Sequence, residues 1–133
     1  FFFLAGHIAF VVVFFIPAGI TTVTWFSLLV VPVVSISIFT RLLSHLGSMR
    51  WPVIAYIAII SIMVVGAASL AARQDYSLQG RALVMAGALL FYVSDLFVAR
   101  HRFVKKSIVN RYAGLPMYYV AQFMLAFSVG MIP

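Results

Sequence analysis

Asp95 is the residue of this chain most able to do chemistry. It is one of two acidic residues and lies within residues 82–99, a stretch that is otherwise uncharged and long enough to cross a bilayer. A carboxylate at such a place costs roughly 2.5–3.5 kcal/mol on insertion scales, so we expect Asp95 to face the interior of a helix bundle and to have a function. The other acidic residue, Asp75, lies in a polar loop.

Other polar side chains are expected at a similar depth. Asp95 lies five residues before Arg100, which is roughly 7–8 Å along a helix from the end of its apolar stretch. Tyr118 and Tyr119 follow Arg111 by seven and eight residues, which places them roughly 10–12 Å from the corresponding edge. One layer of the protein can therefore hold six candidate site residues: Asp95, His7, Ser94, Tyr118, Tyr119 and Gln122.

Each of these residues also has a structural explanation. A buried Asp95 can serve helix packing alone. His7 can hydrogen bond across helices as a neutral side chain, and Tyr118 or Tyr119 can belong to the aromatic belt at the membrane surface. The last two candidates, Ser94 and Gln122, are residue types that commonly form hydrogen bonds between helices.

Motifs for other chemistries are absent from the sequence. It has no Cys, no His-Glu-x-x-His pattern, no glycine-rich phosphate loop and no Gly-x-Ser-x-Gly elbow. His7 and Asp95 alone are too few ligands for a metal site. We therefore expect neither a metal nor an organic cofactor.

The composition indicates an all-α, polytopic transmembrane helix bundle. Hydrophobic residues make up 65% of the 133-residue chain and charged residues only 8%. The net charge of +7 would suggest nucleic acid in a soluble protein, but the basic residues lie between apolar runs, so membrane lipid is the expected partner and nucleic acid is not. We expect a single transmembrane domain over residues 1–133, with five spans at about 1–16, 21–39, 53–72, 82–99 and 112–132.

The loops predict the orientation in the membrane. Seven of the nine Lys and Arg residues fall in the loops 41–52 and 100–111, and only Arg73 and Arg81 fall on the opposite side. This bias predicts that both basic loops are cytoplasmic in a bacterial inner membrane, and that His7 lies in the cytoplasmic half. The chain begins inside an apolar run with no charged segment before it, so we expect an upstream part rather than a signal peptide.

Three segments together resemble the YhhN-like (lysoplasmalogenase) membrane family. Residues 87–95 have the pattern Gly-Ala-x-x-Phe-x-x-Ser-Asp, which is similar to a motif in a late helix of that family. The Phe-x-x-Gly-His segment at residues 3–7 resembles its Phe-x-x-x-His helix, and residues 116–122 resemble the Pro-x-Tyr-Tyr-x-x-Gln stretch of its last helix. The three matches occur in the expected order along the chain.

The resemblance implies an activity. Members of the family with a known activity hydrolyse the vinyl ether bond of lysoplasmalogens, which are lysophospholipids, to a fatty aldehyde and a glycerophospho-alcohol. They have about eight spans, and two intramembrane aspartates are implicated. Asp95 matches the second of these, whereas the Gly-Asp segment of the first is not in this chain.

Vinyl ether cleavage suits the residues. A carboxyl group kept neutral in an apolar site can protonate the alkene carbon, and water can capture the resulting oxocarbenium ion. A second carboxylate would stabilise the cation or activate the water, as in glycosidases. We expect Asp95 to be one of this pair, with His7 and Tyr118 or Tyr119 orienting it or the substrate. We expect Arg100 and Arg102 to bind the phosphate of the head group.

Two other functions remain open. A small proton-coupled transporter could use Asp95 as its coupling site, and Pro32 within the second span is the kind of helix break that transporters contain. A non-catalytic membrane scaffold would use Asp95 only to fix helix packing. The sequence leaves the oligomeric state and the activity of these 133 residues alone undetermined.

Overall fold

A computed structural model describes residues 2–132 of the chain, with side chains from residue 5 onward. Residue 1, where the first predicted span begins, and the side chain of Phe3 lie outside what is described. The described part is built from five α-helices and one short 3-10 turn, which confirms the predicted all-α helix bundle. In chain order the elements are α1 (Phe2–Ala18), α2 (Thr22–Leu46), η1 (Gly47–Met49), α3 (Arg50–Ala71), α4 (Leu78–Phe103) and α5 (Ile108–Val129).

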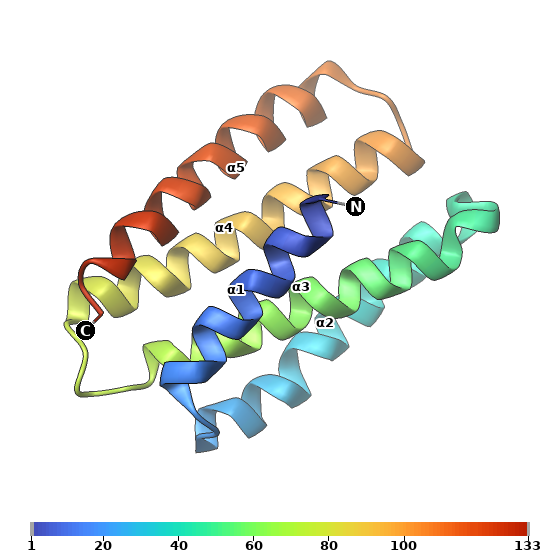
Figure 1. The fold of residues 1–133 in the computed structure, drawn as a ribbon. Helices are drawn as coiled ribbons and strands as arrows, with labels where there is room; N and C mark the ends of the chain where they lie inside the picture. Colours follow the sequence, from blue (N-terminus) through green and yellow to red (C-terminus); the bar gives the residue numbers. More distant parts are fainter. Residues whose placement is uncertain (1, 133) are drawn as a thin grey trace.

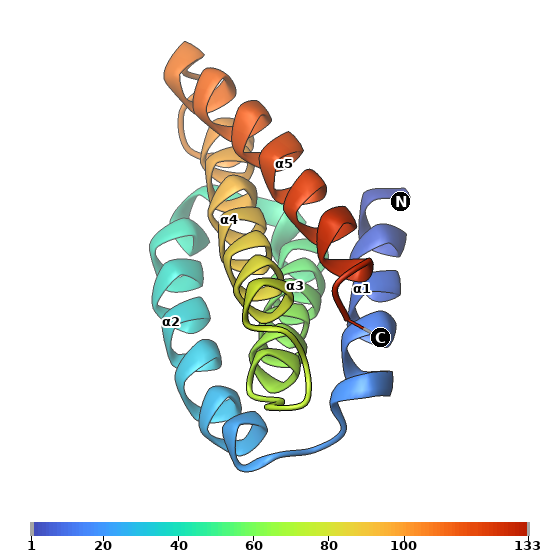
Figure 2. The same ribbon diagram turned by 90° about the vertical axis from the view of Figure 1, so that its left-hand side faces the viewer.

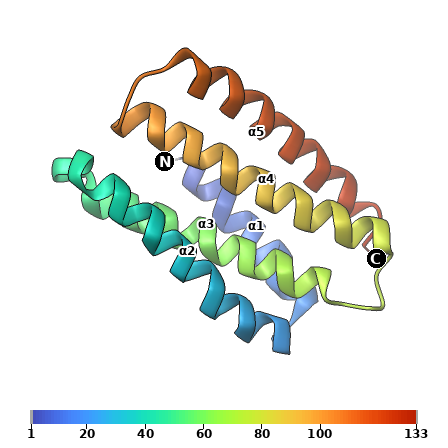
Figure 3. The ribbon, with the colours of Figure 1, turned by 180° about the vertical axis from the view of Figure 1, so that it is seen from behind.

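The helices α3 and α4 form the centre of the bundle (Figures 1 and 2). Helices α1 and α2 pack on α3, and α5 packs on α4. The α2–α3 and α4–α5 connections lie at the same end of the molecule as the start of α1 (Figures 1 and 3). The two predicted basic loops and the N-terminal end of α1 therefore share one end of the bundle, which we call the basic end.

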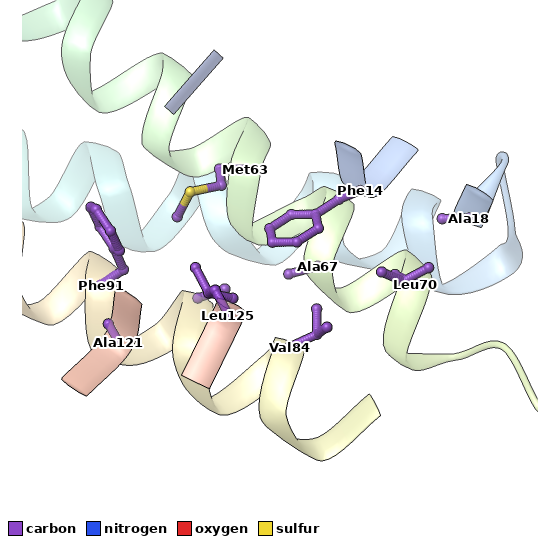
Figure 4. Packing of buried hydrophobic residues seen from close by; sticks show 10 residues of the cluster. Phe14, Ala18, Met63, Ala67, Leu70, Val84, Phe91, Ala121 and Leu125 are labelled. Carbon is purple, nitrogen blue, oxygen red and sulfur yellow. The ribbon is translucent and has the colours of Figure 1, made fainter. Parts of the chain in front are cut away.

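Apolar side chains from α1, α3, α4 and α5 fill the space between these helices (Figure 4). Phe14 of α1 and Met63 of α3 point towards Val84 of α4 and Leu125 of α5, and all four are buried. Close packing of α4 on α5 depends on Gly87, because a Cβ atom there would lie 2.9 Å from the nearest side-chain carbon of Leu125. Larger side chains would force the two helices apart.

The helices continue beyond the predicted spans. The prediction of a loop at 41–52 is wrong, because α2 continues to Leu46 and α3 already begins at Arg50. The turn between them is made at Gly47, whose φ of 51° suits a residue without a Cβ atom. The prediction ended a span at the first charged residue, whereas a helix needs only backbone hydrogen bonds and continues through polar side chains. The same holds for α4, which continues past residue 99 to Phe103.

Local capping fixes where α2 and α4 begin. Thr21 and Thr24 form a reciprocal capping box at the start of α2, and the Ser77 hydroxyl accepts a hydrogen bond from the Gly80 backbone at the start of α4. By length and composition, two helical stretches are long and apolar enough to cross a membrane, namely Thr22–Ala71, which joins α2, η1 and α3, and Leu78–Phe103. The arrangement in five spans remains a prediction.

Candidate active site

The side chains of Asp95 and His7 form a buried pair between α4 and α1. Oδ2 of Asp95 lies 3.0 Å from Nε2 of His7, and each residue is only 1% exposed. Depending on where the proton sits, either the imidazole N–H donates to the carboxylate or the protonated carboxyl group donates to the ring nitrogen. The other oxygen, Oδ1, is buried and has no hydrogen-bond partner within the described residues. The pair thus fixes Oδ2 of Asp95 and leaves Oδ1 available for another interaction.

Aromatic rings fix the orientation of the His7 ring. The edge of His7 meets Phe91 of α4 at 4.7 Å between ring centroids and Tyr56 of α3 at 5.6 Å, both in T-shaped contacts. Phe91 in turn contacts Tyr118 of α5 at 5.2 Å. Such edge-to-face contacts contribute beyond simple burial and restrict ring rotation. Four helices therefore supply the surroundings of the Asp95 carboxyl group.

An amphipathic cavity of about 710 Å³ lies between the α2–α3 hairpin and the α4–α5 hairpin near the basic end. Its walls are mainly apolar, with a single carboxyl group from Asp95 and a single cationic side chain from Arg102. The residues that line it are Ile38, Leu42, Met49, Pro52, Val53, Tyr56, Ile57, Ile60, Asp95, Leu96, Val98, Ala99, Arg102, Phe103, Gly114, Leu115, Tyr118 and Tyr119. This volume lies in the usual range for sites that bind small molecules.

The structure brings together some of the predicted site residues and separates others. His7 contacts Asp95 directly, and three further candidates line the cavity with Asp95, namely Tyr118, Tyr119 and Arg102. The Ser94 hydroxyl donates instead to the Gly114 carbonyl of α5 at 2.8 Å, so it joins two helices. Two candidates are not among the cavity-lining residues, namely Gln122 and Arg100.

Tyr56 is a site residue that the sequence analysis missed. It lies on the cavity wall with Asp95, and its ring contacts the ring of His7 at 5.6 Å between centroids. The position could have been found by depth, because Tyr56 follows Arg50 by six residues and so lies roughly 9 Å along a helix from the basic end.

A second polar network fixes α4 against α2 and α3 beside the cavity. The Ser35 hydroxyl of α2 lies 2.7 Å from the Ser61 hydroxyl of α3 and 2.8 Å from the Tyr92 hydroxyl of α4. All three residues are buried. Hydrogen bonds of this kind hold helices in register where no water competes for the groups, so this network keeps the wall that carries Asp95 in place.

The second acidic residue of the chain is at the opposite end of the bundle. Asp75 accepts two hydrogen bonds from the Arg73 guanidinium, at 2.8 and 2.7 Å, in the connection between α3 and α4. These bonds lower the pKa of the Asp75 carboxyl group to about 2. Asp95 lies roughly 25 Å further along α4, so Asp75 cannot act on the same bond. Within the described residues no group of three potential ligands could hold a metal ion.

Comparison with known proteins places the chain in a family. The YhhN family model matches residues 1–129, which is nearly the whole chain and includes α1 with His7 and α4 with Asp95. Neither a curated protein nor a solved structure matches the chain. The match and the long apolar helices together identify a helical membrane protein. The chain belongs to the YhhN family.

Proposed function

We propose that this protein is a membrane-embedded hydrolase that cleaves the vinyl ether bond of lysoplasmalogen-type lysophospholipids, with Asp95 as the acid. One observation carries the proposal: a buried carboxyl group, held on one side by His7 at 3.0 Å, lies in the wall of an otherwise apolar cavity of about 710 Å³. An acid catalyst needs a carboxyl group that keeps its proton until the substrate binds. A carboxyl group in an apolar wall, shielded from water, meets this requirement.

The first step is proton transfer. The O–H bond of the Asp95 carboxyl group breaks, and a C–H bond forms at the alkene carbon that is not bound to oxygen. The electron pair of the C=C bond forms the new C–H bond, which leaves an oxocarbenium ion at the neighbouring carbon and a carboxylate on Asp95. His7 keeps Oδ2 in place during this step, because the buried hydrogen bond fixes the rotation of the carboxyl group.

The second step is capture by water. Water adds to the oxocarbenium carbon and gives a proton to the Asp95 carboxylate, which restores the acid. The resulting hemiacetal collapses to a fatty aldehyde and a glycerophospho-alcohol. The paired-aspartate mechanism expected from the resemblance requires a second carboxylate near Asp95, and Asp75 does not supply it because it is bound to Arg73 at the other end of α4.

The cavity suits a lipid with one chain and an anionic head group. Its mainly apolar walls accommodate an alkenyl chain through van der Waals contacts, with few polar groups left unpaired beside it. Arg102 is the one cationic side chain on its lining and lies in the last turn of α4 at the basic end, where it can bind a phosphate group. Arg100 is not on the lining, so we assign the head-group role to Arg102 alone.

This assignment is tested by one pair of variants. Arg102→Gln is expected to raise KM for the phosphate-bearing substrate about tenfold or more, because a hydrogen bond to a charged group is lost. Arg100→Gln is the matched control, since it removes the same charge two residues away, and it is expected to leave KM within about twofold. Equal effects of the two variants on KM would show that neither binds the head group specifically.

The orientation in the membrane completes the proposal. We propose that the chain crosses a bacterial inner membrane several times, with the α2–α3 and α4–α5 connections, which fall within the predicted ranges 41–52 and 100–111, in the cytoplasm. Arg41, Arg50 and the basic residues after Ala99 support this, because cationic residues accumulate on the cytoplasmic side. The substrate would then enter from the cytoplasmic leaflet. Labelling of Cys residues introduced at the exposed positions 48 and 106 tests this, and modification of both only after permeabilisation is the expected result.

The activity itself is tested by release of fatty aldehyde from an alkenyl lysophospholipid by the purified protein in detergent or vesicles. The matched substrate is the saturated alkyl ether of the same chain length, which lacks the C=C bond that accepts the proton. Aldehyde from the alkenyl lipid alone is expected. Equal cleavage of both lipids would contradict protonation at carbon, and cleavage of neither would contradict the proposed activity.

A second function is supported by the same pair. A buried His and Asp between helices is also what a proton-coupled transporter uses. Uptake of a solute into proteoliposomes with no chemical change, lost on replacement of Asp95, would favour the transporter. An effect of Asp95→Asn on assembly alone would favour a non-catalytic scaffold.

A further inference from the structure

Tyr56 contacts His7 of the buried His7–Asp95 pair and also lines the cavity. Its ring meets the His7 ring at 5.6 Å in a T-shaped arrangement, and Asp95 lines the same cavity with a buried Oδ1 that has no hydrogen-bond partner among the described residues. Tyr56 is on the cavity lining, whereas His7 is not. The Asp95 carboxyl group thus has a partner behind it, away from the cavity, and a second neighbour on the cavity side.

The chemistry of a phenol suits this place. When the Asp95 carboxyl group gives up a proton, the charge that appears lies in apolar surroundings and requires hydrogen-bond donors. His7 can serve only Oδ2, to which it lies at 3.0 Å. A tyrosine hydroxyl can accept a hydrogen bond from a protonated carboxyl group and donate one to a carboxylate, so it remains a partner before and after the transfer.

The other two tyrosines of the cavity are placed differently. Tyr119 is 58% exposed and contacts Tyr118. Tyr118 packs on Phe91. Tyr56, in contrast, contacts the ring of His7, which is the direct partner of Asp95. The role inferred below is therefore assigned to Tyr56.

We propose that Tyr56 is a positioning residue whose hydroxyl group hydrogen bonds to the Asp95 carboxyl group on the cavity side, holds it towards the substrate and stabilises the carboxylate formed by proton transfer. This inference rests on the proposed function for its kinetic part. The hydrogen bond itself does not depend on which reaction the protein carries out.

The first test is kinetic and compares Tyr56→Phe with Tyr112→Phe. Both variants lose one phenolic hydroxyl and keep the ring, and Tyr112 is exposed and is not among the cavity-lining residues. Tyr56→Phe is expected to lower kcat about 10- to 100-fold, as for loss of a hydrogen bond to a charged group, while KM stays within about twofold. Tyr112→Phe is expected to leave kcat within about twofold. A KM effect without a kcat effect in Tyr56→Phe would overturn the positioning role.

The second test does not require turnover. The infrared C=O stretching band of a protonated Asp95 is assigned by its loss in Asp95→Asn. Tyr56→Phe is expected to shift this band and Tyr112→Phe to leave it unchanged, because only the former removes a hydrogen bond to the carboxyl group. An unshifted band in Tyr56→Phe would overturn the inference whether or not the protein hydrolyses lipid. A shifted band in a protein without hydrolase activity would support the hydrogen bond and overturn only the proposed reaction.

Discussion

Removal of either partner of the His7–Asp95 pair is expected to destabilise the protein by more than the loss of packing. His7→Leu leaves the Asp95 carboxyl group without its imidazole partner in an apolar place. Asp95→Ala leaves the His7 ring nitrogen without its acceptor. The double variant lacks both groups, so no buried polar atom of the pair remains unpaired. The double variant should therefore lose less stability than the two single variants together.

The size of this coupling follows from the burial of the pair. An unpaired buried polar group costs roughly 1–3 kcal/mol, whereas hydrogen bonds between membrane helices average about 0.6 kcal/mol and reach about 1.7. The side chains of His7 and Asp95 are 1% and 0% exposed and lie 3.0 Å apart, so the upper part of the membrane range applies. We expect a coupling free energy of roughly 1.5 kcal/mol.

The assay is unfolding in mixed micelles with increasing dodecyl sulfate, followed by helical circular dichroism. The free energies of unfolding of the wild type, the two single variants and the double variant form a cycle. A second cycle that combines His45→Leu with Asp95→Ala is the control, because His45 is exposed at the end of α2. Strict additivity in the His7–Asp95 cycle, within about 0.3 kcal/mol, would refute the buried pair.

Three further predictions concern packing and charge. Gly87→Val should lower the free energy of unfolding by about 1–3 kcal/mol, because its side chain would collide with Leu125, and an unchanged unfolding midpoint would contradict this contact. Ser94→Ala should cost about 0.6 kcal/mol by the same assay and leave aldehyde release intact, since its hydroxyl bonds to a carbonyl of α5. Asp75→Asn should change the melting temperature little at neutral pH, because its ion pair with Arg73 is exposed. The folded-state pKa of Asp75 is lowered to about 2. The stabilisation of the folded state by the Asp75–Arg73 pair is therefore present above about pH 4 and is lost as the pH falls towards 2. A difference in melting temperature between wild type and Asp75→Asn that persists below pH 2 would contradict the pairing.

The fold followed closely from hydrophobicity, and the errors lie at helix ends. Each of the five predicted apolar runs corresponds to one helix. The prediction of a loop at 41–52 is wrong because charged residues do not end a helix, whereas Gly47 with its positive φ makes the break. Apolar length therefore predicts how much chain can lie in a membrane, and turn residues decide where the helix stops.

Depth along a helix predicted part of the site, and rotation around the helix accounts for the rest. Arg100 and Arg102 lie at similar depths, but two residues turn a helix by about 200°, so only one of them lies on the cavity lining. Gln122, by contrast, lies on nearly the same face of α5 as Tyr118 but one turn deeper, where the lining does not reach it. Depth can be read from sequence spacing, whereas the facing direction of each helix depends on packing against its neighbours.

The proton donor is the central claim, and the most direct measurement is aldehyde release from an alkenyl lysophospholipid in heavy water, with Asp95→Asn and Asp75→Asn beside the wild type. We predict that the wild type and Asp75→Asn release aldehyde with one deuterium on the carbon next to the carbonyl. Asp95→Asn, inserted in the membrane to the same level, should be slower by about 100-fold or more. Full activity of Asp95→Asn, or aldehyde without deuterium, would contradict the assignment of Asp95 as the acid.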